Sequence, residues 1–204
     1  MAKLSALLFL LLGSLYSFGQ TPPSLDLYAS GDNSFAFAYP DTYDLLEGDG
    51  ILKRTQGKHA GIPGCDFLTA FACVVFPSDN LENSRFEAAA FSVNGIPETT
   101  ERSCVGFADQ LPRPHGEHLA IESVFLNGQL FRYASTTTTT PGHFQSARRY
   151  RSFHRGRCYE LRIAISLSDV APSPSPAKNV PEDKDAERAL HSLERVLSSF
   201  VFAD

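Results

Sequence analysis

The stretch Leu119–Ser166, LAIESVFLNGQLFRYASTTTTTPGHFQSARRYRSFHRGRCYELRIAIS, decides the fold, because alternating apolar and polar residues run through it between tight-turn signals. Asn127-Gly128 separates the runs Leu119–Leu126 and Gln129–Thr138. This pair is the one best suited to a type I′ turn, in which both central residues need positive φ. The first half of the stretch therefore predicts a β-hairpin.

The second half predicts another hairpin, in which Gln145–His154 and Cys158–Ser166 pair across Arg155-Gly156-Arg157. The last of these strands is amphipathic, with Glu160, Arg162 and Ala164 opposite a face formed by Tyr159, Leu161, Ile163 and Ile165. Because side chains alternate along a strand, one face of this hairpin is expected in a core.

Elements on both sides of this region complete an α+β pattern. Three strands are predicted before it, at Ser34–Tyr39, Phe67–Phe76 and Phe86–Val93, and they are followed by a helix at Pro97–Gln110. After it come an amphipathic helix at Glu182–Leu197 and a short strand at Ser199–Phe202. We expect an antiparallel sheet of about seven strands packed by two main helices.

The pattern of the two ends resembles a known family. The first strand, Phe35-Ala36-Phe37-Ala38-Tyr39-Pro40, is followed by Tyr43, and the last helix leads into Ser198-Ser199-Phe200-Val201-Phe202. With the long antiparallel middle, residues 30–204 resemble the PsbP-like α/β/α sandwich. Members of that fold are mostly noncatalytic accessory or binding proteins, so the resemblance implies a binding role and assigns it to no residue.

The N-terminus is typical of a secretory signal peptide. Lys3 precedes the largely apolar run Leu4–Leu15, and small residues follow near Gly19. A helix needs roughly twenty apolar residues to cross a bilayer, so we expect residues 1–19 to be cleaved rather than retained as a membrane span. Residues 20–204 then form one exported domain, periplasmic or secreted, with an exposed Pro/Ser loop at 168–181.

The cysteines fit an oxidising compartment, because an even number in an exported chain indicates disulfides. The chain has 4, namely Cys65, Cys73, Cys104 and Cys158, which allow three pairings. The preferred bridge joins Cys104 to Cys158, helix to strand. A bridge from Cys65 to Cys73 would need a turn near residues 66–69, because one straight strand would hold them roughly 26 Å apart.

The densest charge cluster lies on the second hairpin and comprises Arg148, Arg149, Arg151, Arg155 and Arg157, with Arg132 and Arg162 on neighbouring strands. Alternation separates Arg148 from Arg149 and Arg151, so the cluster is divided between two faces. A solvated hairpin is the simpler interpretation. The alternative is a binding site for an anion or acidic polymer that uses Arg149, Arg151, Arg155 and Arg157, because guanidinium groups match carboxylate and phosphate.

Other chemistries have weaker support. His115 and His118 have a spacing that zinc could use, but they follow two prolines in an expected loop. The acids between Asp41 and Asp49 do not have the spacing of a calcium loop, and a solvated turn is expected there. A hydrolase with His118 as a base beside Glu117 or Glu122 stays an alternative without a recognisable nucleophile.

Composition narrows the partners. With 18 basic and 23 acidic residues the net charge is −5, which does not favour nucleic acid as a partner. No cofactor motif is present in the sequence. The sequence thus predicts a noncatalytic exported protein that binds a partner protein or an envelope component, with anion binding and hydrolysis as the two alternatives.

Overall fold

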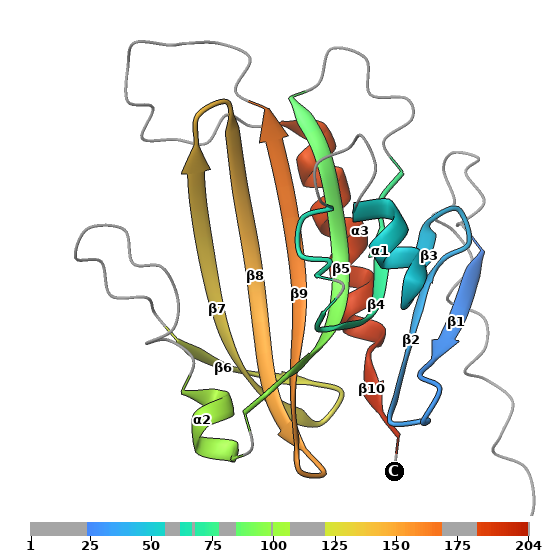
Figure 1. The fold of residues 1–204 in the computed structure, drawn as a ribbon, viewed down its shortest axis with the longest axis vertical. Coiled ribbons are helices and arrows are strands. Elements are labelled where there is room, and N and C mark those ends of the chain that lie inside the picture. Colours follow the sequence, from blue (N-terminus) through green and yellow to red (C-terminus); the bar gives the residue numbers. More distant parts are fainter. Residues whose placement is uncertain are drawn as a thin grey trace, which may run out of the picture.

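The computed structural model describes residues 24–55, 62–66, 68–77, 85–98, 100–106, 121–168 and 183–203 of the 204-residue chain. Within these residues, ten strands form two antiparallel sheets, and three helices accompany them (Figure 1). The predicted leader at residues 1–19 and the Pro/Ser loop beyond residue 168 lie outside the described residues.

The larger sheet has seven strands in the order β3-β4-β5-β9-β8-β7-β6, all antiparallel. They are β3 (Asp44–Leu46), β4 (Ala70–Val75), β5 (Phe86–Ile96), β6 (Glu122–Leu126), β7 (Gln129–Thr140), β8 (His143–His154) and β9 (Arg157–Ser168). The predicted α+β class and the meander of four strands are therefore confirmed. In Figure 1 the meander lies on the left of the molecule.

Both predicted hairpin turns have positive φ at their central residues. Asn127 and Gly128 have φ values of 48° and 83°, and Arg155 and Gly156 have values of 48° and 78°. The second turn is one residue tighter than the sequence predicts, because Arg157 is already part of β9. An arginine at positive φ is uncommon, and here it brings two long strands together through a two-residue connection.

The first and last strands are separate from the large sheet, contrary to the expectation of one sheet. β2 (Phe35–Pro40) lies between β1 (Leu25–Ala29) and β10 (Val201–Phe202) in a three-stranded sheet, on the right in Figure 1. The aromatic alternation of β2 still points into the core, where the ring of Phe37 meets that of Phe91 edge-on at 5.4 Å between centroids. The sequence predicted the buried face of this strand and assigned it to the wrong sheet.

The large sheet is covered on both faces. On one face, α3 (Lys184–Ser199) and the small sheet enclose the main core, which includes Phe91, Leu161 and Leu193. Side chains of this type each contribute about 1.5–3 kcal/mol when fully buried. On the other face, called the second face below, α1 (Asp49–Thr55) buries Ile51 against a smaller cluster with Ala90. None of the helices in the described part of the chain has the length and apolar character that crossing a bilayer requires.

Two predicted elements differ from the structure. The helix expected at Pro97–Gln110 is α2 (Glu101–Val105), because the side chain of Thr100 accepts a hydrogen bond from the Ser103 amide and caps the helix there. Residues 107–110 lie outside the described residues. The segment expected to be a solvated turn contains β3 and α1, with Asp49 in the first helical turn.

Two disulfides join consecutive cysteines. Cys104 of α2 is bonded to Cys158 of β9, the pairing that the sequence analysis prefers, with 5.5 Å between the Cα atoms. Cys65 is bonded to Cys73, and a turn separates them, since the amides of Thr69 and Ala70 both donate to the carbonyl of Asp66. The first bridge attaches α2 to the second face, and the second bridge attaches the 62–66 segment beside α1.

Candidate functional site

Alternation along β8 divides the arginines, as the sequence predicts. Arg148 lies on the α3 side of the sheet and forms an ion pair with Glu194. Arg149 and Arg151 lie on the second face, where the register of β8 with β9 sets Arg149 opposite Arg162 and Arg151 opposite Glu160. These four residues, Arg149, Arg151, Glu160 and Arg162, are called the arginine face.

Arg151 and Glu160 form the central pair of the arginine face. The Arg151 Nε donates to Glu160 Oε2 over 2.7 Å, and the two side chains keep only 6% and 5% of their surfaces exposed. Such a buried pair gives up most of its hydration, so each charge depends on the other. The backbone carbonyl of Glu160 also accepts a hydrogen bond from the side-chain Nδ2 of Asn94 at 3.3 Å, which ties β9 to β5.

Arg149 and Arg162 are far less well compensated. Arg149 Nη1 lies 3.9 Å from the carboxylate oxygen that Arg151 already uses. Among the described residues, the buried Nε atoms of both Arg149 and Arg162 have no hydrogen-bond partner. Burial lowers the pKa of Arg162, and the charge of Arg149 lowers it further, against the opposing effects of Glu160 and Asp66. Among the described residues, Arg149 and Arg151 thus share the carboxylate of Glu160, whereas Glu160 and Asp66 act on Arg162 only through their charges.

The backbone of residues 62–66 lies beside the arginine face. The Ser92 hydroxyl donates to the Gly64 carbonyl over 2.8 Å, so the disulfide-anchored segment 62–66 lies over β5 and β9. A β-carbon at Gly64 would lie 3.4 Å from the Cδ and Nε atoms of Arg162. The segment leaves little room beside Arg162, which explains the burial of its Nε.

Arg155 and Arg157 lie apart from the arginine face, at the tip of the hairpin. Arg155 is an exposed turn residue. Arg157 forms an ion pair with Asp32 at 2.9 Å, and the two side chains are 61% and 52% exposed. The four arginines of the predicted anion site thus divide into two on the second face and two at the turn.

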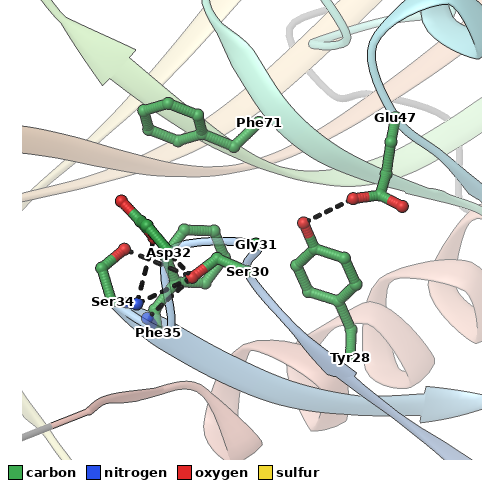
Figure 2. A pocket seen from close by; sticks show the side chains of 8 residues that line it. All are labelled: Tyr28, Ser30, Gly31, Asp32, Ser34, Phe35, Glu47 and Phe71. Atoms are coloured by element: carbon green, nitrogen blue, oxygen red, sulfur yellow. Dashed lines mark hydrogen bonds between the residues drawn. The ribbon is translucent and has the colours of Figure 1, made fainter.

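A cavity of about 230 Å³ lies between the β1–β2 hairpin, the 47–48 turn and β4 (Figure 2). Its lining combines three aromatic rings with two carboxylates: Tyr28, Phe35 and Phe71, then Asp32 and Glu47, with Ser30, Gly31 and Ser34 between them. Sequence reasoning missed this cavity, because its residues come from separate elements and match no linear motif.

Glu160 was also not among the predicted site residues, although a signal for it existed. Glu160 and Arg162 alternate opposite the apolar face of β9. Knowing that Arg149 and Arg151 are their cross-strand partners required the register of β8 and β9, which the two-residue turn fixes. His115 and His118 lie outside the described residues, and the described part of the chain holds no group of three or more ligands suited to a metal.

No family model matches the chain, and no curated protein matches its sequence. Solved structures do resemble it. A protein from Bacteroides thetaiotaomicron matches at 8% identity and a TM-score of 0.44, over 87% of this chain and 48% of that chain, so this chain spans about half the length of that protein. LpqN, described as involved in cell envelope biogenesis of Mycobacterium tuberculosis, matches at 9% identity and a TM-score of 0.48, over 89% and 91% of the two chains.

Cyanobacterial PsbP (CyanoP) from Synechocystis sp. PCC 6803 matches at 16% identity and a TM-score of 0.40, over 94% of this chain and 99% of that chain. PsbP is the family that residues 30–204 resemble in their sequence pattern. At such identities no binding residue is transferred from one protein to another.

Proposed function

We propose that this chain is an exported, noncatalytic binding domain that holds a carboxylate or phosphate group of an envelope component on its arginine face. The observation that carries the proposal is the position of Arg149 opposite Arg162. Within the described residues, Arg149 has a carboxylate oxygen of Glu160 at 3.9 Å, and Arg162 has no ion pair and is balanced through the charges of Glu160 and Asp66. Like charges set directly opposite on neighbouring strands are destabilising. An anion bound beside them would relieve this repulsion.

The donor chemistry supports an anion in particular. Guanidinium groups present N–H donors in a fixed fork that matches the oxygens of a carboxylate or phosphate. Arg149 keeps 21% of its side-chain surface exposed and is therefore the group that a ligand can reach first. Burial lowers the pKa of Arg162, and the charge of Arg149 lowers it further, so an anion beside the two groups would be favoured.

Retention on heparin and binding of fluorescently labelled polyphosphate test the proposal. Because each lost phosphate contact weakens binding and reduces its salt dependence, R149Q together with R162Q should elute at clearly lower salt than the unmodified chain. The matched control is R155Q together with R188Q, which removes the same charge from two exposed positions. Equal loss in both double variants would indicate attraction by net charge alone and would contradict a site on the arginine face.

Export has its own test. N-terminal sequencing of the native protein should begin near residue 20, and thiol titration should find no free sulfhydryl. A native chain that begins at Met1 would refute the cleaved leader. In either case the heparin experiment separately decides whether the arginine face binds anions.

A further inference from the structure

The cavity of Figure 2 has a fixed aromatic wall that ordinary strand alternation would not provide. The register of β4 with β5 shifts between Ala70 and Ala72, so Phe71 occupies a bulge. Bulges re-aim side chains. Phe71 therefore turns toward the small sheet, where its ring lies 6.1 Å from those of Phe35 and Tyr159, and it keeps 40% of its surface exposed.

The absence of a side chain at Gly95 makes room for this ring. A β-carbon at Gly95 would lie 2.7 Å from Cζ of Phe71, closer than two such atoms can approach. Phe71 thus occupies the space that a side chain on β5 would take. With Phe35 fully buried behind it and the Tyr28 ring opposite, the apolar part of the cavity is preformed.

The hydroxyl groups of Tyr28 and Ser30 donate hydrogen bonds to the two carboxylates of the cavity. The Tyr28 hydroxyl donates to Glu47 Oε1 over 2.7 Å. Burial raises the pKa of Tyr28, and the hydrogen bond to Glu47 raises it further, so this proton stays on the phenol at physiological pH. On the other side of the space in Figure 2, the Ser30 hydroxyl donates to Asp32 Oδ1 over 2.9 Å.

The backbone donors at the hairpin turn are used in the same way. The amides of Ser34 and Phe35 both donate to the Ser30 hydroxyl oxygen, and the Ser34 amide also donates to Asp32. Hydrogen bonds to Asp32 from the side chains of Ser34 and Ser30 and from the Ser34 amide lower its pKa to about 2, so it is a carboxylate throughout the physiological range. The polar side of the cavity therefore offers carboxylate acceptors, and the Tyr28 and Ser30 hydroxyls and the Ser34 and Phe35 amides are already engaged as donors.

The charges around the cavity also favour a ligand that donates hydrogen bonds. Asp32 and Glu47 carry two negative charges at the cavity, and the cation in contact with them among the described residues is Arg157, on Asp32 Oδ2. Both members of that pair are more than half exposed, so water and salt screen it. The cavity thus combines spare acceptor positions, a net negative charge and aromatic ring faces. A cation with N–H donors is complementary to all three.

We propose that this cavity binds a small organic cation, an alkylammonium or guanidinium group that lies against Phe71 and donates to Asp32 and Glu47. The volume of about 230 Å³ is below that of pockets for drug-sized ligands, which start at about 300 Å³, and fits a group the size of one side chain. This site is separate from the arginine face and takes the opposite charge.

Titration of the purified, disulfide-bonded chain with butylammonium, butanol and butyrate tests the proposal, read by calorimetry and by amide chemical shifts. Butylammonium should shift the amides of Gly31, Ser34 and Phe71 saturably, and should bind about tenfold or more tightly than butanol, since hydrogen bonds to charged groups contribute that much. Butyrate should not bind there. Equal binding of butanol, or no saturation by butylammonium in the millimolar range, would overturn the proposal.

Variants locate the site. E47Q and D32N should each weaken butylammonium about tenfold, and F71L should weaken it less than F71A, for which we expect about twofold to thirtyfold from the lost ring. D26N removes an equal charge from exposed Asp26 of β1, outside the cavity, and should leave the affinity unchanged. Unchanged affinity in both E47Q and D32N, with unfolding midpoints like that of D26N, would refute the assignment.

A lysine peptide distinguishes a partner protein from a free amine as the source of the cation. The peptide acetyl-Ala-Lys-Ala-amide carries the same ammonium group on a backbone. Tighter binding of the peptide than of butylammonium would identify the ligand as a lysine of a partner protein, whereas weaker binding would identify it as a free amine. Either result is consistent with the cation site, and failure of both ligands refutes it.

Discussion

Glu160 is the residue on which the arginine face depends. It is the carboxylate in contact with both Arg149 and Arg151, and it opposes the lowering of the pKa of Arg162. Replacing one member of a buried ion pair leaves the other uncompensated, which costs about 3–5 kcal/mol. We therefore expect E160Q to lower the free energy of unfolding by about that amount, measured by urea denaturation.

Arg162 should behave in the opposite way. Replacing a poorly paired buried charge by an apolar side chain of similar length is often neutral or stabilising. R162M is thus expected to unfold at the same urea concentration as the unmodified chain or at a higher one, while losing affinity for polyphosphate. A large destabilisation of R162M would mean that Arg162 has a structural role, and would remove the reason for placing an anion beside it.

At the scale of elements, the two disulfides restrain loops of different size. Cys104 and Cys158 are separated by 54 residues and Cys65 and Cys73 by 8. In the chain-entropy model, these bridges contribute about 4 and about 2.5 kcal/mol. We expect the double variant C104A/C158A to melt at a lower temperature than C65A/C73A, as measured by circular dichroism. The reverse order would show that the short bridge, next to buried Ile51 and Ala90, acts mainly through packing.

The sequence predicted those elements whose signals are local. The Asn127-Gly128 turn, the apolar face of β9 and the periodic helix near the C-terminus all follow from short-range patterns. β3 and α1 were missed because three and seven residues are too short to show a period. The separation of β2 from the large sheet depends on long-range pairing with β10, which no local signal encodes.

In the candidate sites, too, some features follow from local sequence patterns and others depend on the fold. That Arg149 and Arg151 share a face follows from alternation within one strand, whereas their contacts with Glu160 and Arg162 depend on register. The cavity combines a turn of the first hairpin with a bulge in β4 and a tyrosine contact to Glu47. Each part is visible in the sequence only after the fold is known.

For the whole molecule, the buried tyrosines make the free energy of unfolding decline at alkaline pH. Burial raises the pKa of Tyr150 to about 12, and it also raises the pKa values of Tyr28 and Tyr43 above the ordinary 10.0. The folded state then keeps protons that the unfolded chain loses, so their contribution to stability is complete below pH 10 and declines as the pH rises above it.

Urea midpoints measured between pH 8 and pH 11.5 should therefore be level at first and then fall. Y28F removes one of these groups and should make the fall of the urea midpoint shallower. Y133F is the comparison variant, because it changes a tyrosine whose ring contacts that of Tyr150. A midpoint that stays constant to pH 11.5 would contradict the buried positions of these phenols.

The connectivity of the two bridges has a consequence for biogenesis. The first cysteine of the chain is bonded to the second, and the third to the fourth. If the chain is exported as proposed, it emerges from its N-terminus into a compartment that oxidises thiols. Cys73 then finds only Cys65 unpaired, and once that bridge has closed, Cys158 finds only Cys104. An oxidase alone can thus produce the native pattern, and no isomerase has to reshuffle it.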